Sequence, residues 1–329
     1  METYDQTTND KYTLINGDCI QVMGKMPDES IDMTIYSPPF HNMYCYSSSV
    51  YDLGNNKSYE EFFEHYKYVV KETFRIMKPG RLVCVHCMDI PKATGLVDFP
   101  GDIIRLHQDN GFMFWDRKNI WKEPLRVAIR TRQRALMHMN LAQDTSKCRG
   151  ALADYLLIFK KKGDNKVPIE KPYGLTEYDG DLSLMNTEEL AEYNTLKIKY
   201  IKHTNDKTNR LSQFIWRRYA SSAWEDIRAN EALCYKPARD KDDDRHVCPL
   251  GLDIITRSII MYSNPGEVVL SPFAGVGSEI YGAVSKGRKG VGIELKPSYY
   301  RQAVKNIMPL INNKGEQLDI FGGFFNEDS

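Results

Sequence analysis

Two short segments, far apart in the chain, carry the residue types that could perform chemistry. Ser37-Pro38-Pro39-Phe40 follows an apolar run near the N-terminus and offers a hydroxyl, an aromatic ring and a carbonyl whose direction the prolines would fix. Ser271-Pro272-Phe273-Ala274-Gly275-Val276-Gly277 follows a second apolar run. Its glycines would let a ligand approach the backbone closely, and a helix starting there would favour a negatively charged group. By itself this second segment would equally serve a nicotinamide-dependent enzyme.

Taken together, the two segments resemble the motifs of one family. The first resembles the catalytic motif of DNA amino-methyltransferases, Asp/Asn/Ser-Pro-Pro followed by an aromatic residue, and the second resembles their loop for S-adenosyl-L-methionine (AdoMet), Asp-Pro-Phe-x-Gly-x-Gly. A catalytic motif that precedes the cofactor loop is typical of the β class of these bacterial and phage enzymes, which methylate N4 of cytosine or N6 of adenine. The resemblance covers most of the chain and implies AdoMet as cofactor and double-stranded DNA as partner.

Methyl transfer to an exocyclic amine requires that its lone pair faces the methyl group. The resemblance implies that the Ser37 side chain and the Pro38 carbonyl accept the two N–H bonds of the amine, with Pro39 stiffening the turn. Phe40 is then expected to stack on a base that has left the duplex. Serine at the first position is more typical of N4-cytosine enzymes, which favours cytosine and leaves adenine open.

Cofactor binding is expected around the glycine-rich segment. Glu294, which ends an apolar run, is expected to hold the ribose hydroxyls, the alternative being a surface charge. Ser271 departs from the family, where aspartate is usual, and so removes a charge that would order the loop. The resemblance assigns eight residues to the cofactor: Asp18, Ser271, Phe273, Gly275, Gly277, Glu294, His246 and Pro249. For Asp18 the alternative is a plain turn residue.

Composition sets the frame for this chemistry. The 329 residues suffice for one large α/β core with a smaller appended module, and no apolar run is long enough to span a bilayer. An odd count of seven cysteines, with no disulfide-like spacing, fits a reducing cytoplasm. Cys84-Val85-His86-Cys87 invites a metal site, but the two cysteines would point to opposite faces of a buried strand, so we expect core cysteines and no metal.

Strands and helices alternate along the chain, which predicts an α/β fold with a mostly parallel sheet and helices on both faces. The resemblance makes this a Rossmann-like AdoMet-dependent methyltransferase fold with circularly permuted motif order. Both chemical motifs follow predicted strands and should line one crevice. We predict strands at 12–15, 31–36, 81–88, 156–159, 267–270 and 290–293, helices at 19–26, 59–77, 250–262, 276–286 and 297–312, a turn at 78–80 and a loop at 46–58.

Four parts follow from this pattern: a catalytic half at 1–162, a target-recognition region at 163–230 without a dominant helical stripe, an AdoMet-binding half at 231–312, and a tail at 313–329. Net charge is zero, but residues 117–134 and 197–218 each carry seven basic residues against one acidic residue. These blocks predict a DNA-facing surface, the alternative being solvated faces. The predicted DNA contacts are Arg126, Arg130, Arg132, Arg134, Lys202, Arg210, Arg217 and Arg218.

The tail carries a separate hypothesis. Gln317-Leu318-Asp319-Ile320-Phe321 resembles the bacterial sliding-clamp-binding pentapeptide, Gln-Leu-x-Leu-Phe, and could dock on a clamp through Gln317, Leu318, Ile320 and Phe321. The alternative is a segment packed on the domain. Three rival functions stay open at this point: an RNA or protein amide methyltransferase, a nicotinamide-dependent oxidoreductase, and an inactive DNA-binding module. A homodimer is also left open.

Overall fold

A nine-stranded sheet forms the centre of the molecule in the computed structural model, which describes residues 5–39, 58–92, 95–131, 138–202, 209–228, 231–238 and 249–312. The strand order is β1-β2-β11-β10-β3-β4-β8-β7-β9. A separate hairpin consists of β5 (Ile90–Lys92) and β6 (Gly95–Val97). The strands of the main sheet are β1 (Asp5–Thr8), β2 (Tyr12–Asn16), β3 (Ile31–Tyr36), β4 (Met77–Met88), β7 (Phe112–Ile120), β8 (Asp154–Lys161), β9 (Ala223–Trp224), β10 (Val268–Ser271) and β11 (Lys289–Glu294).

The sheet is mostly parallel, as predicted. Pairs β2–β11, β11–β10, β10–β3, β3–β4 and β7–β9 are parallel, and the antiparallel pairs involve β1 or β8. From β10 the chain continues to β11 on one side, whereas from β3 it continues to β4 on the other side. The connections after β10 and β3 therefore run to opposite sides, and such a topological switch point, at the carboxyl ends of the strands, is where α/β sheets bind ligands.

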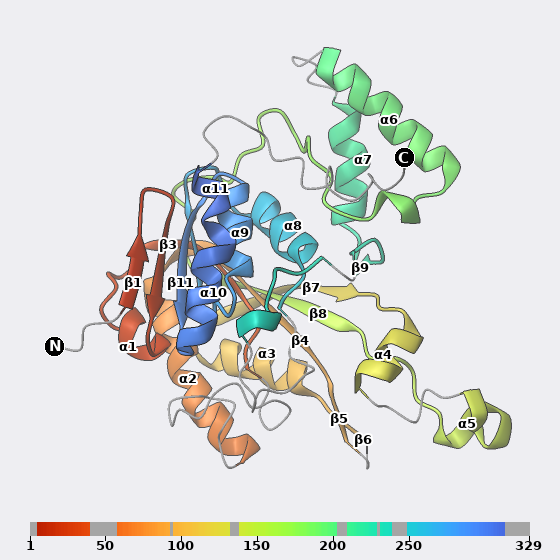
Figure 1. The fold of residues 1–329 in the computed structure, drawn as a ribbon, viewed down its shortest axis with the longest axis horizontal. Coiled ribbons are helices and arrows are strands. Elements are labelled where there is room, and N and C mark those ends of the chain that lie inside the picture. The colour runs from red at the N-terminus through yellow and green to blue at the C-terminus, as the bar shows by residue number, and fades with distance from the viewer. Residues whose placement is uncertain are drawn as a thin grey trace.

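Helices cover both faces of the sheet, which confirms the predicted layers (Figure 1). One face buries apolar side chains from α1 (Cys19–Met23), α2 (Tyr59–Ile76) and α3 (Phe99–Asp109). The other face buries those of α8 (Leu252–Tyr262), α9 (Ser278–Ser285) and α10 (Pro297–Ile307), which α11 (Pro309–Asn312) follows. Among the described helices, none has both the length and the apolarity to cross a membrane.

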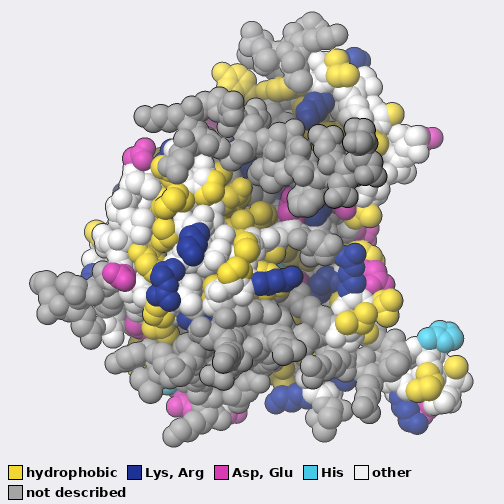
Figure 2. Space-filling view, viewed as in Figure 1, with side chains coloured by type: hydrophobic (Ala, Val, Ile, Leu, Met, Phe, Trp, Pro, Cys, Tyr) yellow, Lys and Arg dark blue, Asp and Glu magenta, His cyan; other side chains and the backbone are white. Residues whose placement is uncertain are grey.

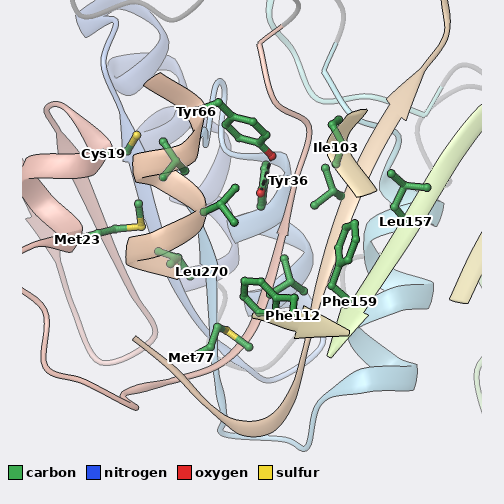
Figure 3. Packing of buried hydrophobic residues seen from close by; sticks show 14 of the residues in the cluster. Cys19, Met23, Tyr36, Tyr66, Met77, Ile103, Phe112, Leu157, Phe159 and Leu270 are labelled. Carbon is green, nitrogen blue, oxygen red and sulfur yellow. Dashed lines mark hydrogen bonds between the residues drawn. The ribbon is translucent and has the colours of Figure 1, made fainter. Parts of the chain in front are cut away.

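Neighbouring residues of β3 belong to opposite faces, because side chains alternate along a strand. Met33 and Ile35 pack toward α8, whereas Tyr36 packs toward α2. Figure 3 shows Tyr36 and Tyr66 of α2 pointing their hydroxyls toward one another, and the two oxygens lie 2.8 Å apart. This buried contact fixes the end of β3, from which the Ser37 motif leaves the sheet.

Helix α2 forms for the reasons that its sequence suggests. Ser58 caps it by accepting the N–H of Glu61, and buried residues at helical spacing face the sheet. The predicted turn at 78–80 is wrong in detail, because β4 already begins at Met77 and absorbs these residues through a register shift against β3. Gly80 has a φ of 73°, and a Cβ there would lie 2.6 Å from the Asn165 backbone, so only glycine fits.

Residues 163–230 contain more regular structure than expected. Helix α6 (Thr187–Lys202) and helix α7 (Arg210–Tyr219) pack together around Leu196, Leu211 and Phe214 and form a small core of their own. Figure 1 shows this pair standing apart from the sheet. The expectation of no helical stripe is therefore wrong, because apolar residues at helical spacing had been obscured by the charges between them.

Candidate active site

The two chemical motifs lie at the same edge of the sheet. Strand β3 pairs in parallel with β10, with Met33 opposite Val269 and Thr34 opposite Leu270, so both strands end at the crevice. Ser37 follows β3 directly, whereas Ser271 is the last residue of β10 and not the first after it. The rings of Tyr36 and Phe273 lie 5.6 Å apart between centroids, which brings the two segments into contact. The two motifs are therefore neighbours at this edge of the sheet, and their lining of one ligand crevice stays a prediction.

Ser37 is held by the neighbouring strand. Its Oγ lies 3.1 Å from the carbonyl oxygen of His86, to which it donates, and 3.4 Å from Nδ1 of the same residue. Pro38 is buried and Pro39 is half-buried, whereas Phe40 lies outside the described residues. The hydroxyl is thus fixed in place before any substrate arrives, with Oγ lone pairs left to accept a further hydrogen bond.

His86 continues into a polar chain that the sequence did not suggest. Its Nε2 lies 3.2 Å from Oδ2 of Asp154 in β8, and Oδ1 of Asp154 lies 2.5 Å from Nζ of Lys122. Because Nε2 is buried and has no well-aligned hydrogen bond, the His86–Asp154 contact is electrostatic and oblique to the ring N–H. The sequence signal that could have found His86 was its place between Cys84 and Cys87.

The two cysteines are core residues, as expected. Cys84 packs against the face that α8 covers and Cys87 against the face that α2 covers, so they cannot join in one site. Burial raises the pKa of both thiols, which keeps them neutral and inert. The described residues contain no group of three or more His, Cys, Asp or Glu side chains that could hold a metal ion.

The glycine-rich segment forms a tight loop around the carboxylate of Glu294. The N–H of Gly275 donates to Oε2 and the N–H of Lys296 donates to Oε1, both at 2.8 Å. Gly277 has a φ of 87° and precedes α9 directly. Glu294 is therefore more than a surface charge, because it fixes the loop that leads into the helix.

This loop has the properties that a polar, nucleotide-like ligand needs. Within the described part of the chain, the hydroxyl oxygens of Ser271 and Ser278 are buried without a hydrogen-bond partner. Buried polar atoms are almost always paired, so a bound ligand is a natural partner for them. A Cβ built on Gly275 would meet nothing within 4 Å, which leaves open space beside the loop. The residues present therefore fit AdoMet.

A second carboxyl group lies beside the loop. Glu279, in the first turn of α9, is 4% exposed. Burial, with a smaller contribution from repulsion by Glu294, raises the pKa of Glu279 to about 8. Sequence reasoning missed this residue, because a glutamate in the first turn of a helix ordinarily serves as an exposed partner of the helix dipole.

The remaining cofactor predictions fare differently. Asp18 follows β2, which pairs with β11, and so lies at the same edge of the sheet as Glu294. The side-chain amide of Asn16 links these two strands by donating to the Glu294 carbonyl oxygen at 2.7 Å. Asp18 also caps α1 by accepting the N–H of Gln21 at 2.9 Å, which is the turn role considered as its alternative. Pro249 precedes α8, and His246 lies outside the described residues.

Among the described residues predicted to contact DNA, exposure and pairing differ. Arg126 on α4 (Pro124–Thr131) and Arg210 and Arg217 on α7 are exposed, whereas Arg218 pairs with Glu189 at 2.8 Å and lies over the Phe214 ring. On the side of the molecule that faces the viewer in Figure 2, the described Lys and Arg side chains are scattered among apolar and acidic ones. The side chains of Arg130 and Lys202, and the residues Arg132 and Arg134, lie outside the description.

Two members of the first basic block serve the fold. Lys118 in β7 is 5% exposed and pairs with Asp116 at 2.7 Å, and the Arg117 guanidinium lies over the rings of Phe114 and Tyr155. Counting charges along the sequence overestimated the exposed charge, because alternate residues of a strand point to opposite faces, so that Lys118 is buried whereas Arg117 stays exposed.

Comparisons with known proteins point to one family of enzymes. Type II methyltransferase M.BamHI of Bacillus amyloliquefaciens is 25% identical over 283 residues, which cover 86% of this chain and 54% of that protein. Type II methyltransferase M.BglI of Bacillus subtilis is 23% identical over 322 residues, which cover 90% of this chain and 86% of that protein. The chain thus spans about half the length of M.BamHI and most of M.BglI.

Solved structures share the fold. TTHA0409 of Thermus thermophilus, in complex with S-adenosyl-L-methionine, superposes with a TM-score of 0.58 at 20% identity, covering 92% of this chain and 97% of that one. The cytosine-N4-specific PvuII DNA methyltransferase gives 0.57 at 15% identity, covering 93% of both chains. The DNA methylase family model for N6-adenine and N4-cytosine enzymes matches residues 31–305, a range that contains both chemical motifs. The chain therefore belongs to this family of DNA amino-methyltransferases.

Proposed function

We propose that the protein transfers a methyl group from AdoMet to N4 of cytosine in duplex DNA, with N6 of adenine as the alternative. The observation that carries the proposal is Ser37, a neutral hydroxyl held at the end of β3, next to a tyrosine whose ring contacts Phe273 of the glycine-rich loop. Serine at this position is the feature that favours cytosine within the family. Both amines need the same two acceptors, so the choice of ring depends on pocket residues beyond this motif.

Ser37 and Pro38 orient the amine in this proposal. The Ser37 hydroxyl accepts one N–H of the amine and the Pro38 carbonyl accepts the other, which turns the nitrogen lone pair toward the methyl group. These acceptors also stabilise the positive charge that develops on the nitrogen. Phe40 would stack on the extruded base, a contact worth about 1–3 kcal/mol per base. AdoMet supplies an electrophilic methyl group on a sulfonium centre.

The cofactor is held by the loop of Phe273, Gly275 and Gly277. The Glu294 carboxylate fixes this loop, and its position at the end of β11 is the one from which an acidic residue holds ribose hydroxyls. The unpartnered hydroxyl of Ser271 is available to a polar group of AdoMet, although it lacks the charge of the usual aspartate. Asp18, His246 and Pro249 remain proposed contacts.

DNA would be contacted by the region of α6 and α7. The exposed Arg210 and Arg217 lie on α7, whose buried face packs against α6. Arginines on an exposed helical face neutralise phosphates and position a duplex without reading its sequence. Residues 163–230 stay our proposed target-recognition region, with Arg126 as a separate contact from α4.

The experiment that tests the function is methylation of duplex DNA with isotope-labelled AdoMet, followed by mass spectrometry of the nucleosides. Labelled N4-methylcytosine is the expected product. Labelled N6-methyladenine would support the same site but show that adenine, and not cytosine, is the methylated base. RNA of the same sequence serves as the comparison substrate, and label in RNA alone would overturn the proposal.

Substitutions in the first motif give the matching prediction. Ser37→Ala removes one acceptor of the amine, and Phe40→Ala removes the stacking surface, so each should lower the methylation rate about 100-fold or more. AdoMet affinity, measured by calorimetry, should stay within about twofold of the wild type because neither side chain belongs to the glycine-rich loop. Near-normal turnover in both variants would refute the assignment of this motif.

A further inference from the structure

Behind Ser37 lies a chain of polar side chains that no step described above uses. Nδ1 of His86 is 3.4 Å from Ser37 Oγ, and Nε2 of the same ring is 3.2 Å from Asp154 Oδ2. Lys122 closes the chain, with Nζ 2.5 Å from Asp154 Oδ1. Strands β4 and β8 and the segment after β7 supply these three residues, so the chain depends on the tertiary structure alone.

Burial and charge together keep Asp154 ionised. His86 and Asp154 are each 13% exposed and Lys122 is 21% exposed, so their charges are only partly screened by water. Burial raises the pKa of Asp154, but His86 and Lys122 outweigh that effect and leave the pKa below its ordinary value. Asp154 is therefore a carboxylate that stabilises positive charge on the His86 ring.

The chemistry of the motif creates a need for such a chain. An amine that gains a methyl group must lose a proton, and a serine hydroxyl cannot keep it as a carboxylate could. Ser37 Oγ lies 3.1 Å from the His86 carbonyl oxygen, to which it donates, and 3.4 Å from Nδ1, which is a second acceptor when the ring proton is on Nε2. A rotation of the hydroxyl hydrogen therefore points it at the ring nitrogen.

We propose that His86 is a positioning residue that acts through Ser37, orienting the hydroxyl and taking up its proton during methyl transfer. This inference rests on the proposed function of Ser37. With Nε2 protonated toward Asp154, Nδ1 carries the lone pair that Ser37 needs. The Asp154 carboxylate, 3.2 Å from Nε2, electrostatically favours a proton on that nitrogen and stabilises the imidazolium, and Lys122 keeps Asp154 ionised and in place.

Atoms and charge balance when methyl transfer is coupled to proton transfer through Ser37. The amine nitrogen forms a bond to the methyl carbon while the carbon–sulfur bond breaks. The electron pair of the carbon–sulfur bond stays on sulfur, which becomes a neutral thioether. The nitrogen, now cationic, passes one proton to Ser37 Oγ as the Ser37 hydroxyl proton moves to His86 Nδ1. The methylated amine and the serine are then neutral, His86 is an imidazolium, and solvent later removes its proton.

The test measures single-turnover methylation by the full chain with the duplex that the wild type methylates. His86→Asn keeps an acceptor near the Nδ1 position but cannot take up a proton, so the rate should fall about 100-fold. The dissociation constants for AdoMet and for DNA should remain within about twofold of the wild type. His65→Asn, an exposed histidine of α2, is the matched control and should leave the rate unchanged.

A second background separates the proton role from a structural one. Ser37→Asp places a carboxylate that can itself hold the proton, so adding His86→Asn there should change the rate less than about threefold. A His86→Asn rate within about threefold of the wild type, or the same fold-loss in both backgrounds, would overturn the inference. If Ser37→Asp is inactive, the wild-type background decides whether His86 acts on the chemical step: a rate loss with both dissociation constants unchanged supports the positioning role, and an unchanged rate overturns it.

Failure of the function itself gives a different pattern. A wild type that labels no DNA, or a Ser37→Ala variant at full rate, removes the proposed role of Ser37 whatever His86 does. A wild type that is active, an inactive Ser37→Ala variant and a fully active His86→Asn variant would leave the function intact and refute only the relay.

Discussion

Single side chains in the crevice are positioned by partners that lie far away in the sequence. Ser37 gains its orientation from His86, and the loop at Gly275 gains its shape from Glu294. In both cases a hydrogen bond from one strand end fixes a group on the next strand end. Preorganisation of this kind matters for methyl transfer, because an acceptor already in place needs no reorganisation during the reaction.

Glu279 gives a prediction at the residue scale. Burial raises its pKa to about 8 in the folded protein, from an ordinary value of 4.5. The folded state then binds more protons than the unfolded state between these values, so the free energy of unfolding falls as pH rises from about 4.5 to about 8. The cost approaches about 1.4 kcal/mol for each unit of pH across that window.

Glu279→Gln removes this ionisation. We expect urea unfolding of the ligand-free variant to show a stability gain over the wild type that grows from pH 5 to pH 8 and is constant above that range. Glu267→Gln is a useful contrast, because Arg81 and Asn264 outweigh the effect of burial and lower the pKa of Glu267. A difference between Glu279→Gln and wild type that is the same at every pH would contradict the prediction.

At the scale of elements, the junction between β10 and α9 depends on close packing against α10. Gly277 has a φ of 87°, and a Cβ there would lie 3.0 Å from Ala303 Cβ and from Ile307 Cδ1. The junction therefore needs glycine for both its conformation and its lack of volume. Close packing against α10 therefore restrains the proposed cofactor loop at Gly277.

Gly277→Ala should destabilise the protein by about 1–2 kcal/mol through backbone strain and by about 1–3 kcal/mol more through overpacking. Gly266→Ala is the matched control: its φ is 78°, but nothing lies within 4 Å of the Cβ position, so only the strain applies. Thermal unfolding and AdoMet calorimetry on both variants measure the difference. Equal losses would show that contact with α10 is unimportant.

The α6–α7 pair is joined to the sheet domain through a buried charge. Arg257 of α8 is fully buried, donates to Asp226 at 2.9 Å and lies over the rings of Tyr219 and Trp224. A guanidinium at this place is satisfied only if the segment before α6, which supplies the Asp179 carbonyl oxygen, and the segment after α7, which supplies Asp226, are folded around it. The contact therefore sets the orientation of the proposed recognition region relative to the crevice.

For the whole molecule, the tail stays a hypothesis of the sequence, because residues 313–329 lie outside the described part of the chain. If Gln317–Phe321 binds a bacterial sliding clamp, Leu318→Ala with Phe321→Ala should abolish capture of purified clamp by the immobilised full chain, since both apolar anchors are lost. Phe325→Ala is the matched control outside the pentapeptide. Equal recovery of the clamp by the wild type and the double variant would end the hypothesis.

Much of the architecture could be predicted from local sequence patterns. Apolar runs that end at Ser37 and Ser271, the helical spacing in Tyr59–Ile76 and the glycines after β10 specify strands, a helix and a tight loop through short-range sterics and burial. The family and the order of its two motifs followed from these segments. Strand β7 and helices α6 and α7 escaped prediction, because charged residues on their exposed sides hid the apolar pattern.

By itself, the sequence determined the family, the fold class and the residues of both motifs, since these depend on residue types at fixed spacing. Only the tertiary structure decided which side chains contact and position the two motifs. Three separate segments supply His86, Asp154 and Lys122. The pKa of Glu279 rises only when α9 packs against the sheet and buries the carboxyl group. The distribution of basic residues was likewise decided by folding, because burial and ion pairing removed Lys118 and Arg218 from the free surface charge. Pairing across strands and desolvation are long-range effects, and no local pattern encodes them.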